Sequence, residues 1–151
     1  MSHISGQDLS KGLLIVCDGG SLNNQSSDRF GYGSMVVMKG GKIVPSTYQN
    51  EKTSHHLFEY GPGVTNNAAE LHTLKHALRY AKELLERGYA DVIRIGSDSQ
   101  VALLGATTNI KKPAKQLVPL YQTVRKLALD LRTQVQFIKL DDGQVKAILG
   151  H

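Results

Sequence analysis

A change in hydrophobic period near residue 66 is the feature of this sequence that most restricts its fold. From Asn66 to about Arg87, apolar residues recur at intervals of three and four, which indicates an amphipathic α-helix. The residues before this point contain only short apolar runs, such as Leu13–Cys17, which are typical of buried strands. The helix is therefore expected to cover a sheet. Its apolar positions are Leu71, Leu74, Ala77, Leu78, Ala81, Leu84 and Leu85.

Short segments on both sides of this helix complete the predicted α/β architecture. Three strands joined by short loops form an antiparallel meander before it, and residues 50–64 are expected to be irregular. A flexible tail (residues 1–10) precedes one domain (residues 11–151), a five-stranded mixed sheet flanked by helices in the order βββ-α-β-α-α-β-α. The predicted strands are Gly12–Cys17, Phe30–Met38, Lys42–Tyr48, Asp91–Gly96 and Val135–Leu140, and the other predicted helices are Ser99–Gly105, Lys115–Leu131 and Asp141–His151.

Charge and composition exclude several classes of protein. The chain carries 18 Lys and Arg against 13 Asp and Glu, a net charge of +5, which permits a polyanionic partner. No apolar run approaches the roughly 20 residues that span a bilayer, and no glycine-rich phosphate-binding motif suggests a nucleotide cofactor. The single cysteine, Cys17, fits a reducing compartment. We therefore expect a cytoplasmic protein that contacts neither a membrane nor a nucleotide cofactor.

Three acidic residues have a structural explanation when taken singly. Asp18 suits a turn after the first strand, and Asp98 suits the N-cap of the helix that follows it. Glu70 has the right spacing for a capping box with Asn67.

Taken together, these acids indicate a metal site. Glu70 falls on the apolar side of its helix, where an unpaired carboxylate is costly to bury. Asp18 and Asp98 both follow strands, at the sheet edge where open α/β folds bind ligands. If those two strands are neighbours, three carboxylates converge and require a hard divalent cation, for which Mg²⁺ fits best.

The histidines and the cysteine give no comparable signal. His72 and His76 are four residues apart on the polar side of the predicted helix, and His55 and His56 lie in the irregular stretch. We expect all four to be solvated rather than to bind a metal. Cys17 is expected to be a small core residue.

The segments that contain the three acids resemble the core motifs of the type 1 ribonuclease H family. They are Cys17-Asp18-Gly19-Gly20-Ser21, Thr65-Asn66-Asn67-Ala68-Ala69-Glu70-Leu71 and Ser97-Asp98-Ser99-Gln100. The resemblance covers about residues 11–151 and implies a ribonuclease H-like fold and an endonuclease that cleaves the RNA strand of an RNA–DNA hybrid. It also implies two Mg²⁺ ions, for which Mn²⁺ can substitute. Asp18 would bridge both ions, and Glu70 and Asp98 would each position one.

The same resemblance implies which residues contact the substrate. The 2′-OH of RNA both donates and accepts hydrogen bonds. Asn66, Asn67 and Gln100, with the backbone around Gly19, match the family positions that recognise it. Asn24, in the loop after the first strand, is similar to a further substrate-contacting asparagine. Asn66 or Asn67 can equally cap the helix.

The C-terminal segment departs from the family pattern. Family members carry a fourth acid on the last helix, often after a flexible loop with a histidine, and this chain has neither that loop nor the usual Ala-Asp pair. Counting without gaps from the last strand places His151 near the fourth position, where an imidazole can bind a metal or relay a proton. A frayed terminal residue is the equal alternative. Asp141 and Asp142 are further candidates, for which helix capping is the simpler explanation.

The basic helical protrusion of some family members is also missing. The nearest cations for hybrid phosphates can equally form a solvated face, so we expect modest, salt-dependent binding by a monomer. Two other functions stay open: a hybrid-binding module that has lost catalysis, and a DNA-cutting nuclease of the same superfamily. The cations are Lys111, Lys112, Lys115, Arg125 and Lys126.

Overall fold

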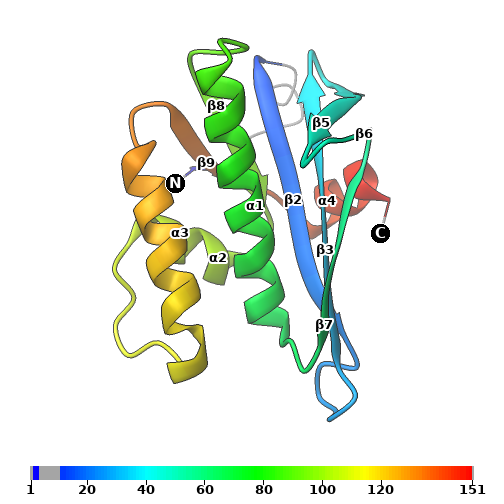
Figure 1. Ribbon diagram of the computed structural model, residues 1–151, viewed down its shortest axis with the longest axis vertical. Helices are drawn as coiled ribbons and strands as arrows, with labels where there is room; N and C mark the ends of the chain where they lie inside the picture. The colour runs from blue at the N-terminus through cyan, green and yellow to red at the C-terminus, as the bar shows by residue number, and fades with distance from the viewer. Residues whose placement is uncertain (1, 4–10, 151) are drawn as a thin grey trace.

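The strand β2 (Leu13–Leu22) lies at the centre of the sheet and is paired along both edges (Figure 1). The computed structural model, which describes residues 2–3 and 11–150, places β3 (Phe30–Lys39) antiparallel to β2 over its whole length. On the other side, β8 (Ile93–Ser97) runs parallel to β2. Successive side chains of β2 are buried on opposite faces of the sheet, as its continuous apolar run predicts.

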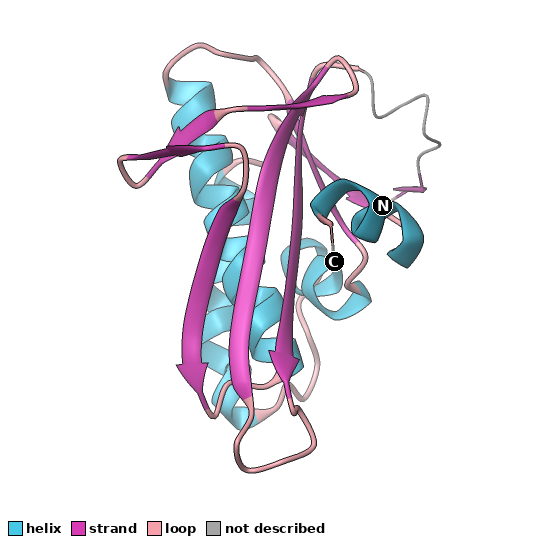
Figure 2. Cartoon of the chain, turned by 90° about the vertical axis from the view of Figure 1, so that its right-hand side faces the viewer, coloured by secondary structure: helices cyan, strands magenta, loops and turns pink. Residues whose placement is uncertain are grey.

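Shorter strands extend this centre in both directions. They are β1 (Ser2–His3), β4 (Lys42–Val44), β5 (Ser46–Tyr48), β6 (Glu51–Thr53), β7 (His56–Pro62) and β9 (Val135–Lys139). The main sheet has the order β1-β9-β8-β2-β3-β4, with β7 also paired to β3, and β5 and β6 form a separate hairpin (Figure 2). β1 is parallel to β9. A short paired strand therefore lies within the segment predicted to be a tail.

Helices pack on both faces of the sheet (Figures 1 and 2). They are α1 (Asn66–Glu86), α2 (Gln100–Thr107), α3 (Val118–Asp130), which follows a 3₁₀ turn (Lys115–Leu117), and α4 (Asp142–Leu149). The helix α1, predicted from the hydrophobic period, lies across β2 and β3, with α2 and α3 beside it. The helix α4 covers the opposite face. Within the described residues, no helix combines the length and apolar character needed to cross a membrane.

The sheet separates two hydrophobic cores. We call the larger one, between the sheet and α1, α2 and α3, the α1-side core. The smaller one, beneath α4, is the α4-side core. A mixed sheet flanked by helices confirms the predicted fold class. The α4-side core consists of Leu14, Val16, Val36, Met38, Ile138, Leu140, Val145 and Leu149.

The strand β2 is longer than the sequence predicts. It continues through Gly19 and Gly20 to Leu22, so Asp18 lies within a strand rather than after one. A Cβ added to Gly20 would lie 2.7 Å from Tyr32 Oη. These glycines therefore permit close packing within a strand, and do not mark the turn that their sequence suggests.

The third strand of the meander also differs from the prediction. The segment predicted as one strand, Lys42–Tyr48, divides into β4 and β5, and β7 is the strand that pairs along β3. β7 lies in the stretch predicted to be irregular. The side of β7 that faces α1 carries His56, Phe58 and Tyr60, whereas the apolar Leu57 is 72% exposed, so the strand lacks the usual alternation of apolar and polar residues.

The rings of β7 change the environment of the histidines. His76 stacks on Phe58 with ring centroids 4.2 Å apart, and His72 stacks on Tyr60 at 4.9 Å. His56 is itself buried in β7. Burial lowers the pKa of His76 to about 4. The prediction that these three histidines are solvated is therefore wrong, because it missed the strand that covers this side of α1.

Candidate active site

Asp18 and Asp98 lie side by side because they occupy matching positions on neighbouring parallel strands. In the register of β2 and β8, Val16 is opposite Gly96. Two residues further along each chain, Asp18 meets Asp98, and their side chains hydrogen-bond to each other. The condition on which the predicted convergence depended, that these two strands are neighbours, is therefore met.

Glu70 reaches the same place from α1, and Gly19 makes this possible. A Cβ added to Gly19 would lie 2.4 Å from the carbonyl oxygen of Ala69 and 2.8 Å from the backbone nitrogen of Glu70. Any side chain there would push the start of α1 away from β2. Without one, the two backbones meet directly beside Asp18, and the charges of Asp18 and Asp98 both act on Glu70.

The helices beside these acids are capped by other residues. Thr65 caps α1 and Ser99 caps α2, each hydroxyl accepting from the backbone N–H three residues later at 3.2 and 3.1 Å. The caps suggested by the sequence at Asn67 and Asp98 are therefore not the ones that form. Helix capping does not account for Asp98 or Glu70.

Asp142, at the start of α4, is a fourth acid of this cluster. The N–H of Leu140 donates to the carbonyl of Ser97 at 2.9 Å, which holds the end of β9 against the end of β8. This contact brings α4 to the sheet edge, where the Asp142 side chain hydrogen-bonds to Asp98. Asp142 also forms an ion pair with Lys146 at 3.1 Å. Three carboxyl groups are thus linked in a row, with Glu70 beside them.

The neighbouring Asp141 takes the capping role that the sequence offered to both aspartates. Asp141 is the N-cap of α4, and its N–H donates to Gln144 Oε1 at 2.9 Å. The spacing of Asp141 and Gln144 is that of a capping box, and this signal distinguishes the two aspartates in the sequence. His151, the other candidate for the fourth position, lies outside the described residues.

Burial and like charge make most of the cluster difficult to ionise. Desolvation, then the charge of Asp98, raises the pKa of Asp18 to about 7. Desolvation, then the charges of Asp18 and Asp98, raises the pKa of Glu70 to about 7. Desolvation also raises the pKa of Asp98. Asp142 differs, because its hydrogen bond with Lys146 lowers its pKa. Full ionisation of the cluster at neutral pH therefore requires additional positive charge.

The donor atoms of the cluster fit a hard divalent cation. They are carboxylate oxygens, the ligands that Mg²⁺ and Mn²⁺ prefer. Burial raises the pKa of the adjacent Cys17 thiol, so no thiolate is available there for a softer metal. Across residues 11–150, no three His, Cys, Asp or Glu side chains already stand in the arrangement of a metal site. The carboxyl groups of the cluster instead hydrogen-bond to one another, and a cation would replace those bonds.

The residues predicted to contact substrate lie at the starts of α1 and α2. Asn24 Oδ1 accepts from the N–H of Asn66 at 2.8 Å, and Asn66 Oδ1 accepts from the N–H of Ser21 at 2.8 Å. The loop after β2 is therefore tied to the first turn of α1. Asn67 and Gln100 are exposed in the first turns of their helices. Asn66 and Asn67 lie in the turn of α1 before Glu70, and Gln100 lies two residues after Asp98, so the backbone brings all three close to the acids.

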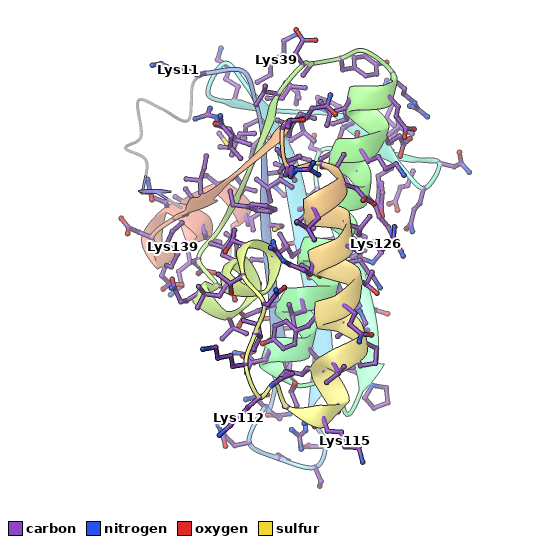
Figure 3. The ribbon with its side chains drawn as sticks, turned by 90° about the vertical axis from the view of Figure 1, so that its left-hand side faces the viewer. Lys11, Lys39, Lys112, Lys115, Lys126 and Lys139 are labelled. Atoms are coloured by element: carbon purple, nitrogen blue, oxygen red, sulfur yellow. The ribbon has the colours of Figure 1, made fainter. Side chains whose placement is uncertain are left out.

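The five predicted phosphate-binding cations divide into two groups. Arg125 donates to a carbonyl of α2 at 2.8 Å, and Lys126 pairs with an aspartate of its own helix at 3.2 Å. Lys111, Lys112 and Lys115 are exposed in the connection between α2 and α3. Figure 3 shows Lys112 and Lys115 at the end of the molecule where α1 begins. This second group is the part of the predicted set that lies on an exposed connection, where an external anion can approach.

Comparisons with known proteins agree with this geometry. A model of the RNase H family matches residues 10–151. The N-terminal RNase H domain of a Mycobacterium tuberculosis protein is 19% identical, with a TM-score of 0.62 over 90% of this chain and 92% of that one. RNase H1 from the archaeon Halobacterium salinarum is 19% identical, with a TM-score of 0.56 over 91% and 94%. LC11-RNase H1 bound to an RNA/DNA hybrid is 15% identical, with a TM-score of 0.61 over 90% of each chain. A sequence comparison with curated proteins gave no match.

Proposed function

Because the chain belongs to the RNase H family, we propose that it is an endoribonuclease that hydrolyses the RNA strand of RNA–DNA hybrids. The observation that carries this proposal is the convergence of four carboxyl groups from β2, α1, the end of β8 and the start of α4. The complex of LC11-RNase H1 with an RNA/DNA hybrid supports the substrate class.

The proposed mechanism assigns a role to each acid. Two divalent cations, Mg²⁺ with Mn²⁺ as a substitute, would supply the activation of the attacking water and the stabilisation of the leaving oxygen. Asp18 hydrogen-bonds to Asp98 and its charge acts on Glu70, so its carboxylate is the one that would serve both metal positions. Glu70 would hold one position and Asp98 the other. Asp142 would complete the position held by Asp98.

Recognition of RNA is assigned to the polar groups at the starts of α1 and α2. The side-chain oxygens of Asn24 and Asn66 accept backbone hydrogen bonds, which orients their NH₂ groups as donors. Asn67 and Gln100 present exposed amides that can both donate and accept. A 2′-OH, which also does both, is the group that such a set discriminates.

Cleavage of a labelled RNA–DNA hybrid tests the proposal. We expect the wild type to cut the RNA strand only when Mg²⁺ or Mn²⁺ is present. The variant Asp18→Asn should lose at least about a thousandfold in rate, the several kcal/mol that well-held metal ions supply. Asp91→Asn is the matched control, because Asp91 is exposed and precedes β8, whereas Asp98 follows it. Its rate should stay within about twofold of the wild type.

Two other outcomes would select the alternative functions. Equal cleavage of double-stranded DNA would identify a DNA-cutting nuclease. A wild type as inactive as Asp18→Asn that still binds the hybrid would identify a binding module.

A further inference from the structure

The β5–β6 hairpin (residues 46–53) stands apart from the main sheet. Within the described residues, its two strands pair only with each other, and each has three residues. Gln49 and Asn50 join them with φ of 51° and 64°, the backbone of a tight type I′ turn. A two-stranded hairpin is at best marginally stable in water by itself. This one therefore depends on its contacts with the rest of the protein, which it meets in the half of the molecule where α1 ends (Figure 1).

Two hydrogen bonds connect side chains of this hairpin to other elements, and both end on histidine rings. Tyr48 Oη is 2.8 Å from Nδ1 of His76 on α1, and Ser46 Oγ is 3.0 Å from Nε2 of His56 on β7. The Tyr48 ring is itself 5% exposed and lies 5.1 Å from the ring of Tyr80. The hairpin is therefore held in place by one buried tyrosine and two imidazoles.

The surroundings of His76 oppose a positive charge on its ring. The ring is stacked on Phe58 at 4.2 Å, and the rings of Tyr48 and Tyr60 lie 5.7 and 6.2 Å from it. These neighbours are neutral, and the face of Phe58 attracts a cation only weakly. Desolvation lowers the pKa of His76 to about 4, aided by three basic groups of α1: Lys75, Arg79 and His72.

His56 is buried among the same rings. It is 2% exposed, with the ring of Tyr48 at 6.0 Å and that of Tyr80 at 5.8 Å. Desolvation lowers the pKa of His56, although the charge of Glu51 and a hydrogen bond to the backbone of Ser46 act in the opposite direction. Both of these partners belong to the hairpin. The closed hairpin therefore holds two neutral imidazoles that are largely removed from water.

We propose that the β5–β6 hairpin is an acid-sensitive flap, which separates from α1 and β7 when His76 and His56 take up protons, while the main sheet stays paired. In the open form both imidazoles are solvated and bind protons at their ordinary pKa. Because the open form binds protons more readily than the closed form, acid favours opening. The neutral rings stabilise the closed form above about pH 6.5, and this stabilisation is lost as the pH falls towards about 4. The flap requires neither metal ions nor a nucleic acid, so it is independent of the proposed function.

Hydrogen exchange of the full-length chain, followed by NMR and corrected for the intrinsic pH dependence of amide exchange, tests this proposal. For His76 alone, a closed-state pKa of about 4 predicts that the equilibrium constant for opening rises by about 50- to 100-fold between pH 7.5 and 4.5. The protection of residues 46–53 should fall by this factor or disappear. Amides of β2 should stay at least about tenfold better protected than those of the hairpin, because they require a larger opening.

The double variant His76→Asn and His56→Gln removes both titrating groups. Asn places an amide near the position of the imidazole Nδ1 and Gln near that of Nε2, so a hydrogen-bonding partner remains for Tyr48 and for Ser46. Protection of the hairpin should be lower at pH 7.5, because ring packing is lost, but should change by less than about fivefold down to pH 4.5. His55→Gln is the matched control, because it removes the imidazole adjacent in sequence to His56, before β7 begins. It should behave as the wild type.

The outcomes divide as follows. A wild-type hairpin whose protection changes by less than about threefold, or whose amides lose protection together with those of β2, overturns the proposal. An unchanged pH dependence in the double variant also overturns it, because other groups then cause the opening. Loss of the pH dependence in the double variant, with His55→Gln like the wild type, supports it. The wild-type measurements are decisive even if the double variant does not fold.

Discussion

The two faces of the central sheet support the acid cluster unequally. Among the described residues, the α1-side core contains 21 buried side chains and the α4-side core contains eight. Glu70 projects from the 21-residue helix α1 and is half-buried. Asp142 projects from the eight-residue helix α4, and its side chain is 71% exposed. The larger α1-side core therefore supports the helix that carries Glu70, and the smaller α4-side core supports the helix that carries Asp142.

This difference separates the acids by how they depend on the fold. Glu70 cannot move without disturbing the contact of α1 with Gly19, where the two backbones touch. Asp142 moves with α4, which is anchored chiefly by Val145 and Leu149. Loss of the Glu70 carboxylate should therefore cost more activity than loss of the Asp142 carboxylate, whereas a change in core packing should disturb the site more through α4 than through α1.

The largest expected contrast is between the two acids themselves. Glu70→Gln should reduce the hybrid cleavage rate by about a thousandfold, because it removes a ligand held on a rigid helix. Asp142→Asn should cost only about 10- to 100-fold, because that ligand is exposed and already shared with Lys146. Initial rates at saturating Mg²⁺ measure both. Equal losses in the two variants would contradict the conclusion that the two faces of the sheet support the acids unequally.

Deletions in the two cores should separate stability from activity. Leu74→Ala, in the α1-side core, should lower the free energy of unfolding by about 3 kcal/mol, and Val145→Ala, in the α4-side core, by about 1–2 kcal/mol. Val145→Ala should nevertheless slow cleavage more at a temperature where both variants are folded, because it loosens the helix that carries Asp142. Urea denaturation and cleavage rates test this, and a slower Leu74→Ala enzyme would contradict it.

Glu70 and Asp142 should have opposite effects on how the stability of the metal-free protein depends on pH. The pKa of Glu70 is raised from 4.5 to about 7. Its contribution to folding stability is therefore present below its unfolded pKa and is lost as the pH rises through about 7. The pKa of Asp142 is lowered, so its contribution is present above its unfolded pKa and is lost as the pH falls.

The wild type should therefore lose stability between about pH 4.5 and 7 through Glu70, and Glu70→Gln should not show this loss. The wild type should also gain stability from Asp142 that persists at neutral pH, and Asp142→Asn should lack this gain. Denaturation midpoints measured in a chelator from pH 4 to 8, each compared with the wild type, give the two differences. Differences of the same sign would refute the assignment of the two environments.

The smallest expected effect concerns the stiffness of α4. A Cβ added to Gly143 meets no atom within 4 Å, and alanine favours a helix over glycine by up to about 1 kcal/mol. Gly143→Ala should raise the free energy of unfolding by about 0.5 kcal/mol and leave Mn²⁺ affinity equal to or tighter than that of the wild type. Weaker binding would show that α4 needs flexibility to place Asp142.

The sequence predicts the acids better than the strands around them. The place of Asp18 and Asp98 after apolar strand segments, and of Glu70 on the apolar side of its helix, follows from local sequence patterns, whereas the pairing of β2 with β8 that brings the two aspartates together had to be assumed. The length of β2 was missed because Gly19 and Gly20 read as a turn. Their real role, the close approach of α1 and of a tyrosine ring, depends on contacts that are distant in sequence.

The missed strand β7 also caused the wrong prediction for the histidines that it covers. The sequence does not predict β7 because its residues do not alternate between apolar and polar. Without this strand, the rings that stack on His72 and His76 could not be predicted either. The sequence leaves Asp142 a candidate for the fourth acid with helix capping as the simpler explanation, because either of two adjacent aspartates can cap a helix. The capping-box spacing of Asp141 and Gln144 assigns the cap to Asp141, and the end of β9, held against β8, brings Asp142 to Asp98.

The continuation of β2 beyond Asp18 has a consequence for the thermodynamics of assembly. Four further residues, as far as Leu22, stay in the ladder with β3. The backbone that carries Asp18 can therefore open only when an interior stretch of sheet separates, which is a rare event. Of the acids, Asp18 has the least positional entropy left to lose when substrate and cations bind. The entropic cost of completing the site falls mainly on α4.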